Sequence, residues 1–188
     1  AAADQPAETP MPDGTRESLA ATRDSLAAAS HLPPVYGPAS GDLIHEEDNT
    51  IEMHYAGVNL NNFAAKATID NPFSTADGPW DFGFVFRQEE ADDELRLVVR
   101  SDGLWNLNNR QDNEDNLIQE GTVSAYLNVA DGGQNEIMLV ANGEMGLFFL
   151  NGKLIEALDL SEKENFGDFA LGTGFYSADE REGAVSRY

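Results

Sequence analysis

A tryptophan followed by amide and guanidinium side chains is the strongest candidate for ligand-binding chemistry in this chain. Trp105 is followed closely by three polar residues, Asn106, Asn108 and Arg110. A sugar site on a β-sheet needs an aromatic surface beside a few well-placed polar groups that fix orientation. The pattern therefore predicts a carbohydrate site at these four residues. The alternative is that Trp105 shares the alternation of its strand and packs in the core or at its rim.

A polar stretch beyond this cluster carries carboxylates that suit calcium. Ca²⁺ takes several hard oxygen ligands, and the candidates here are Asp112, Glu114 and Asp115. Their spacing departs from that of an EF-hand loop, which needs glycine at its sixth position. A merely polar loop is the alternative interpretation. We expect no required cofactor, with Ca²⁺ as the one candidate ion.

The recognised catalytic patterns are missing from the sequence. Glycoside hydrolysis needs two carboxylates that face each other across a cleft. The nearest run, Glu90–Glu94, lies between two expected strands and has the composition of a solvated turn. The three histidines lack metal-ligand spacing, and the sequence contains neither a Gly-x-Ser-x-Gly elbow nor a phosphate-binding glycine loop. We therefore expect a protein without enzymatic activity.

Charge and composition exclude several classes of partner. The chain has 34 acidic and 11 basic residues and a formal net charge of -23. Such a surface repels nucleic acid and anionic lipid, which bind through clustered Lys and Arg. Cysteine is absent, and no apolar run approaches the ~20 residues of a membrane span. The first four residues, Ala1–Asp4, are typical of a site cut by signal peptidase, which predicts a secreted or cell-surface protein.

Residues 1–40 are expected to form an N-terminal region separate from the main domain. A polar tail precedes Thr15–Ser30, where good helix formers predict a helix with Leu19 and Leu26 on one face. A lone helix of this length is marginal in water, so it docks on its own domain or on a partner. A proline-rich connector follows. The candidate partner-binding arm consists of Leu19, Leu26, Leu32, Val35 and Tyr36.

Residues 41–188 have the alternating pattern of antiparallel β-strands. In Trp80–Arg87 the large aromatic residues share one face, and Arg87 is expected on the other. Asn-Gly turns at 142–143 and 151–152 predict a three-stranded meander over Asn135–Leu160. About ten short strands separated by turns predict an all-β antiparallel sandwich of jelly-roll type. The last strand, near Val185–Tyr188, is expected to be short unless the natural chain continues beyond it.

The order of these segments resembles the concanavalin A-like jelly-roll superfamily, and more narrowly laminin-G-like and keto-disaccharide-hydrolase-like domains of secreted bacterial proteins. The residues that carry the resemblance are Trp80–Arg87, Leu95–Val98, Phe149–Gly152, Leu158–Ser161 and Gly172–Tyr176. The resemblance covers roughly residues 50–188 and implies a fold that hosts lectins, hydrolases and adhesion modules. It implies no catalytic residue here.

Three functions follow as hypotheses. The first is a secreted, non-enzymatic structural or interaction module, a subunit of an extracellular or cell-surface assembly that binds a protein partner or itself through the N-terminal arm. The second is a lectin-like domain that binds a glycan at the Trp105 cluster. The third, implied by the resemblance alone, is a glycoside or keto-sugar hydrolase.

Overall fold

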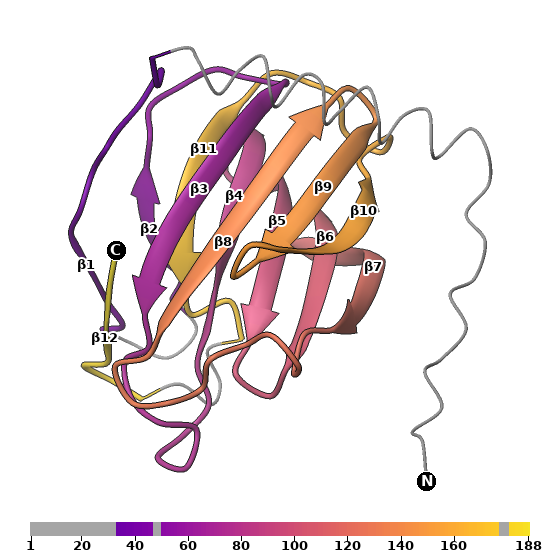
Figure 1. The fold of residues 1–188 in the computed structure, drawn as a ribbon. Coiled ribbons are helices and arrows are strands. Elements are labelled where there is room, and N and C mark those ends of the chain that lie inside the picture. The colour runs from indigo at the N-terminus through magenta and orange to yellow at the C-terminus, as the bar shows by residue number, and fades with distance from the viewer. Residues whose placement is uncertain (1–32, 47–49, 177–180) are drawn as a thin grey trace, which may run out of the picture.

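Two antiparallel sheets packed face to face make up most of the protein (Figure 1). The structure is a computed structural model that describes residues 33–46, 50–176 and 181–188. The larger sheet has six strands in the order β2-β11-β4-β5-β6-β7, and the smaller has four in the order β10-β9-β8-β3. A separate pair, β1-β12, joins the two ends of the described chain.

The strands are three to ten residues long, and turns of two or three residues join the successive strands from β4 to β7 and from β8 to β10. In the six-stranded sheet they are β2 (Glu52–Tyr55), β11 (Asp168–Thr173), β4 (Asp81–Glu90), β5 (Asp93–Arg100), β6 (Leu104–Gln111) and β7 (Glu114–Thr122). In the four-stranded sheet they are β10 (Lys153–Asp159), β9 (Met145–Leu150), β8 (Gln134–Asn142) and β3 (Phe63–Asp70). The remaining pair consists of β1 (Asp42–Ile44) and β12 (Val185–Arg187).

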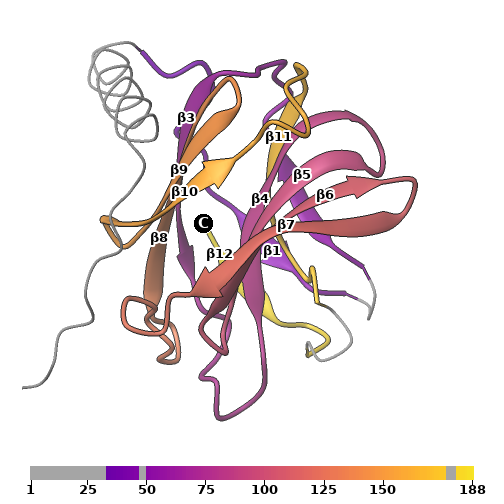
Figure 2. The ribbon, with the colours of Figure 1, turned by 90° about the vertical axis from the view of Figure 1, so that its right-hand side faces the viewer.

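The sandwich expected from the sequence is confirmed. Figure 2 shows the two sheets as separate layers. The predicted meander is also present, because β8, β9 and β10 are consecutive neighbours in one sheet. The helix expected over Thr15–Ser30 lies outside the described residues. In the part of the chain that the structure describes, no helix is long and apolar enough to cross a membrane.

The core is built from the side chains that face inward from both sheets. Phe82, Phe84 and Phe86 of β4 are almost completely buried, as the aromatic alternation predicts. From the smaller sheet, Phe148 of β9 meets Trp105 edge-on, with ring centroids 5.4 Å apart. Each fully buried aromatic side chain of this size contributes about 1.5–3 kcal/mol by its removal from water. The aromatic alternation of β4 therefore fixes which face of the larger sheet is inward.

Arg87 departs from the alternation that the sequence suggests. It was expected on the outer face, but a register shift after Phe86 and a φ of 55° turn it toward the end of the sandwich. There its guanidinium is 0% exposed. Its nitrogens donate to the carbonyls of Asn61 (2.9 Å), Gly143 (2.6 Å) and Lys163 (2.5 Å). One buried side chain thus binds three segments that border the smaller sheet.

The segment before β11 runs directly against this arginine. A Cβ at Gly167 would lie 2.3 Å from the carbonyl carbon of Arg87, which is closer than any side chain tolerates. Only glycine lets the two backbones approach in this way. Burial lowers the pKa of Arg87, and the charge of Glu164 opposes that shift. Because arginine stays protonated in proteins, the buried guanidinium is a cation whose partners are backbone oxygens.

Arg87→Met is expected to lower the free energy of unfolding by roughly 3 kcal/mol or more, because each buried carbonyl left without a donor costs about 1–3 kcal/mol. Urea unfolding followed by tryptophan fluorescence measures the effect. The matched control is Arg187→Met, an exposed arginine whose loss should cost less than about 0.5 kcal/mol. Equal effects of the two substitutions would show that Arg87 does not hold the end of the sandwich.

Candidate functional site

The outer face of the six-stranded sheet carries a row of polar side chains on the neighbouring strands β5 and β6. On β5, Leu95, Leu97 and Val99 point into the core, so the residues between them point outward. On β6, Trp105 and Leu107 point inward in the same way. The register sets Arg96 opposite Asn108 and Glu94 opposite Arg110. We call the resulting cluster the polar face, and it consists of Glu94, Arg96, Asn106, Asn108, Arg110 and Asp115.

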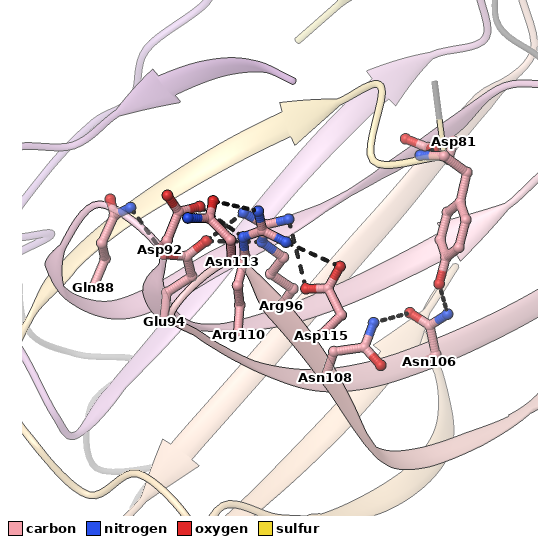
Figure 3. A network of polar contacts seen from close by, with 11 residues as sticks. Asp81, Gln88, Asp92, Glu94, Arg96, Asn106, Asn108, Arg110, Asn113 and Asp115 are labelled. Atoms are coloured by element: carbon pink, nitrogen blue, oxygen red, sulfur yellow. Dashed lines mark hydrogen bonds and ion pairs between the residues drawn. The ribbon is translucent and has the colours of Figure 1, made fainter. Parts of the chain in front are cut away.

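The centre of the polar face is an ion pair within one strand. Arg96 donates from Nε (2.8 Å) and Nη2 (2.5 Å) to Oε1 of Glu94, whose side chain is almost fully buried. The other carboxylate oxygen of Glu94 accepts a hydrogen bond from Gln88 at 3.2 Å. Because the pair is largely removed from solvent, its attraction is screened less than that of a surface pair. Figure 3 shows the two side chains at the middle of the network.

A second arginine ties the hairpin between β6 and β7 to this centre. Arg110 donates to Asp92 at 2.7 Å and to Asp115 at 3.2 Å, and Asp115 also lies 3.8 Å from Nη1 of Arg96. Partial burial acts to lower the pKa of Arg110, but hydrogen bonds with Asp92 and Asp115 outweigh it, so the pKa is raised. Asp115 therefore links both arginines into one network (Figure 3).

The amide side chains beside this network lead to an aromatic ring. Asn108 donates to the side-chain oxygen of Asn106 at 3.3 Å, and Asn106 donates to the hydroxyl of Tyr176. The Tyr176 ring also lies over the guanidinium of Arg100, with 4.7 Å from Cζ to the ring centroid. Tyr176 is 39% exposed. An accessible aromatic ring thus borders the polar groups.

Asp81 positions this ring. The Asp81 carboxylate at the start of β4 accepts hydrogen bonds from the backbone N–H groups of Gly174 (2.9 Å), Phe175 (3.1 Å) and Tyr176 (2.8 Å). Gly172 leaves room for this fold-back, since a Cβ there would lie 3.1 Å from the Phe175 ring. Gly172 therefore admits the Phe175 ring close to the backbone of β11.

The structure brings together three of the four residues predicted to bind sugar. Asn106, Asn108 and Arg110 share the polar face, but Trp105 is 2% exposed and packs in the core against Phe148. The prediction of an exposed aromatic surface at Trp105 was therefore wrong. Trp105 alternates along β6 in step with Leu107, and both side chains point into the core. Tyr176, from a distant segment, supplies the accessible ring instead.

Three further residues of the site, Glu94, Arg96 and Tyr176, were missed by the sequence analysis. The run Glu90–Glu94 was taken as a solvated turn, but Glu94 is buried within β5 and paired with Arg96. The signal that could have identified the pair is the spacing of two residues on one strand, which places both side chains on the same face. Tyr176 lies 70 residues from its partner Asn106, and no local pattern predicts that contact.

The predicted calcium residues occupy a tight hairpin turn rather than a loop. Asp112 and Asn113 have φ values of 54° and 67°, as a two-residue type I′ turn requires, and β7 begins at Glu114. Asp115 is already bound to Arg110. In residues 33–46, 50–176 and 181–188, no group of three or more His, Cys, Asp or Glu side chains is arranged to hold a metal ion. Calcium binding by Asp112, Glu114 and Asp115 stays a sequence-based prediction without geometric support.

Only part of the predicted partner-binding arm is described. Leu19, Leu26 and Leu32 lie outside the described residues, whereas Val35 and Tyr36 are 79% and 43% exposed. The Tyr36 hydroxyl forms a hydrogen bond with His54 of β2, and the His54 ring lies 5.0 Å from that of Tyr188. The connector therefore contacts its own domain near the end of the described chain.

Comparisons with known proteins identify the fold. No protein-family model and no curated protein sequence matches the chain. Among solved structures, carbohydrate-binding module CBM66 from Bacillus subtilis is 13% identical, with a TM-score of 0.58 over 80% of this chain and 87% of that one. The fold is the concanavalin A-like jelly roll.

Two other solved structures share this jelly roll. A glycoside hydrolase family 16 endo-glucanase from Bacteroides ovatus, in complex with G4G3G-2F-DNP, is 11% identical, with a TM-score of 0.54 over 78% of this chain and 77% of that one. Sheep galectin-11, in complex with glycerol, is 16% identical, with a TM-score of 0.50 over 65% and 89%. Identities this low establish the fold alone. The narrower resemblance to laminin-G-like and keto-disaccharide-hydrolase-like domains stays a prediction.

Asp81→Ala is expected to release the segment that carries Tyr176, because a charged acceptor of three backbone hydrogen bonds is lost. Hydrogen exchange at the amides of Gly174, Phe175 and Tyr176 should accelerate at least about tenfold, since each such bond contributes about 1.5–3 kcal/mol. The control is Asp77→Ala, in an exposed turn between β3 and β4. Unchanged exchange at these three amides would contradict the role given to Asp81.

Proposed function

We propose that this protein is a non-enzymatic carbohydrate-binding module that holds a glycan on the polar face. The observation that carries the proposal is the placement of an ion-pair network and a chain of amides on one face of the sheet, bordered by the accessible ring of Tyr176. The partly exposed groups are those of Arg110, Asp115 and Tyr176. Sugar hydroxyls both donate and accept hydrogen bonds, so they match this combination of guanidinium, carboxylate and phenol. The other members, Glu94, Arg96, Asn106 and Asn108, are at most 9% exposed and support these groups from within the sheet. A ring held beside such groups can pack on the apolar face of a sugar.

The charges of the polar face favour a neutral glycan. Each arginine on this face has a carboxylate at ion-pair distance: Arg96 with Glu94, Arg110 with Asp92, and Arg100 with Asp102. An anionic sugar would compete with these internal carboxylates. It would also approach a protein with a formal net charge of -23. A neutral sugar neither competes with these carboxylates nor is repelled by the negative charge of the protein.

The comparisons support this choice without deciding it. CBM66, which aligns with 80% of this chain, is by its name a carbohydrate-binding module, and the Bacteroides ovatus protein is an endo-glucanase. Binding and hydrolysis of sugars are therefore both plausible on this fold. Glycoside hydrolysis needs two carboxylates that face each other across a cleft. Glu94 and Asp115, the carboxylates of the polar face, are each bound to an arginine instead, and this arrangement favours binding over hydrolysis.

Arg110→Met is expected to weaken glycan binding at least about tenfold, because a charge-assisted hydrogen bond contributes about 1.5–3 kcal/mol. Wild-type protein is first screened on an array of neutral oligosaccharides, and the affinity for the best ligand is then measured by calorimetry. The matched control is Lys66→Met, which removes an exposed cation from the outer face of the other sheet. Lys66→Met should bind as the wild type does.

Two outcomes of this experiment would overturn the proposal. One is no binding across the array, and the other is an equal loss of affinity in Arg110→Met and Lys66→Met. The same array sugars also test the hydrolase alternative. Product release that survives purification and disappears in Asp115→Asn would replace the non-enzymatic proposal with a glycosidase.

The other parts of the initial functional hypothesis stay predictions. Export to the cell surface, membership of an extracellular assembly and a protein partner for the N-terminal arm are compatible with a glycan-binding module. A module of this kind would attach the assembly to a sugar surface. Comparing the solution mass of the full chain at low and high salt tests whether it self-assembles.

A further inference from the structure

The outer face of the four-stranded sheet carries an apolar cluster, separate from the main core. We call it the back patch, and it consists of Met138, Val140, Leu147, Phe149 and Ala157. The register pairs Val140 with Leu147, Met138 with Phe149, and Leu147 with Ala157, so the members share one face. The residues between them, such as Leu139 and Phe148, belong to the main core. The back patch therefore faces away from the interior.

Two members of the back patch are nevertheless buried. Leu147 is 0% exposed and Val140 is 4% exposed, although Ala64 and Lys66 on the same face of β3 are exposed. Among the strands that the structure describes, none lies across this side of the sheet, which faces the viewer in Figure 1. Because no described strand covers Val140 and Leu147, residues outside the described ranges and a second molecule are the candidates for their cover.

We propose that residues 15–30 of the same chain dock on the back patch. Their sequence predicts a helix with Leu19 and Leu26 on one face, and such a short helix needs a surface on which to bury them. Only His31 and Leu32 separate this segment from the described chain. Figures 1 and 2 place the first described residues beside the end of the smaller sheet at which β3 begins.

The length and charge of residues 15–30 also suit docking on the back patch. Sixteen helical residues rise roughly 24 Å, and a strand of seven residues spans roughly 23 Å, so the helix would cover the face from end to end. The segment contains Arg16 and Arg23 against Glu17 and Asp24, so it is neutral. Docking it adds no charge to a strongly acidic protein. The glycan face on the opposite sheet would remain open.

A spin label on the full chain tests this docking directly. The chain lacks cysteine, so Ala21→Cys gives a single attachment site on the side of the predicted helix away from Leu19 and Leu26. Amide NMR signals of Met138–Val140 and Leu147–Phe149 should lose at least about twice as much intensity as those of β5 and β6, which lie one sheet further away. Leu26→Asp should abolish this difference, and Ala28→Asp, on the opposite side of the predicted helix, should preserve it.

A mixed sample separates docking in the same chain from docking of another copy. Isotope-labelled chains without the spin label are combined with spin-labelled chains that lack the isotope. Signal loss at the back patch in this sample would overturn the proposal in favour of a second copy. A uniform intensity across both sheets in the single-chain sample, or a pattern unaffected by Leu26→Asp, would also overturn it. A dispersed spectrum of each variant shows that the sandwich is folded.

Discussion

The two-residue period of β5 and β6 couples the core of the protein to its candidate site. Leu95, Leu97 and Trp105 fill the interior, and the residues between them are thereby forced onto the outer face. A slip of one residue would move Arg96 into the core and a leucine into water, at a cost that the fold cannot sustain. The position of the polar network is therefore set by the packing of the hydrophobic residues behind it.

Contacts between distant segments position the parts of the structure that the alternation alone does not place. Asp81 holds the end of β11 through three backbone N–H groups, and that contact brings Tyr176 to the amides of β6. At the other end of the sandwich, Arg87 binds the carbonyls of segments that border the smaller sheet. Two buried charged groups of β4 thus fix the segments around it: Asp81 accepts hydrogen bonds, and Arg87 donates them.

Much of the fold could be predicted from the sequence, because its signals are local. Period-two alternation and Asn-Gly turns identified the strands and the meander of β8, β9 and β10. The burial of Arg87 could not be predicted, because its positive φ turns the side chain away from the direction that the alternation of the strand gives it. Asp112 and Asn113 were taken for part of a loop because each tolerates the positive φ of a tight turn, a property that composition alone does not reveal.

The candidate site was predictable only in part. Asn106, Asn108 and Arg110 follow from one strand's alternation, and that same alternation sends Trp105 to the core. The aromatic member, Tyr176, is joined to them by tertiary structure alone. Sites assembled from distant segments leave no fixed spacing in a sequence, so residue type and local order could identify half of this network at most.

Chemical-shift mapping with a neutral oligosaccharide tests the central claim most directly. The isotope-labelled full chain is titrated with the tetrasaccharide that binds best on the array, and backbone and side-chain amide shifts are followed. Our account predicts that the largest shifts occur at the side-chain amides of Asn106 and Asn108 and at the backbone amides of Arg110 and Tyr176. Saturable shifts confined to the four-stranded sheet, or to the edge formed by β1 and β12, would contradict it.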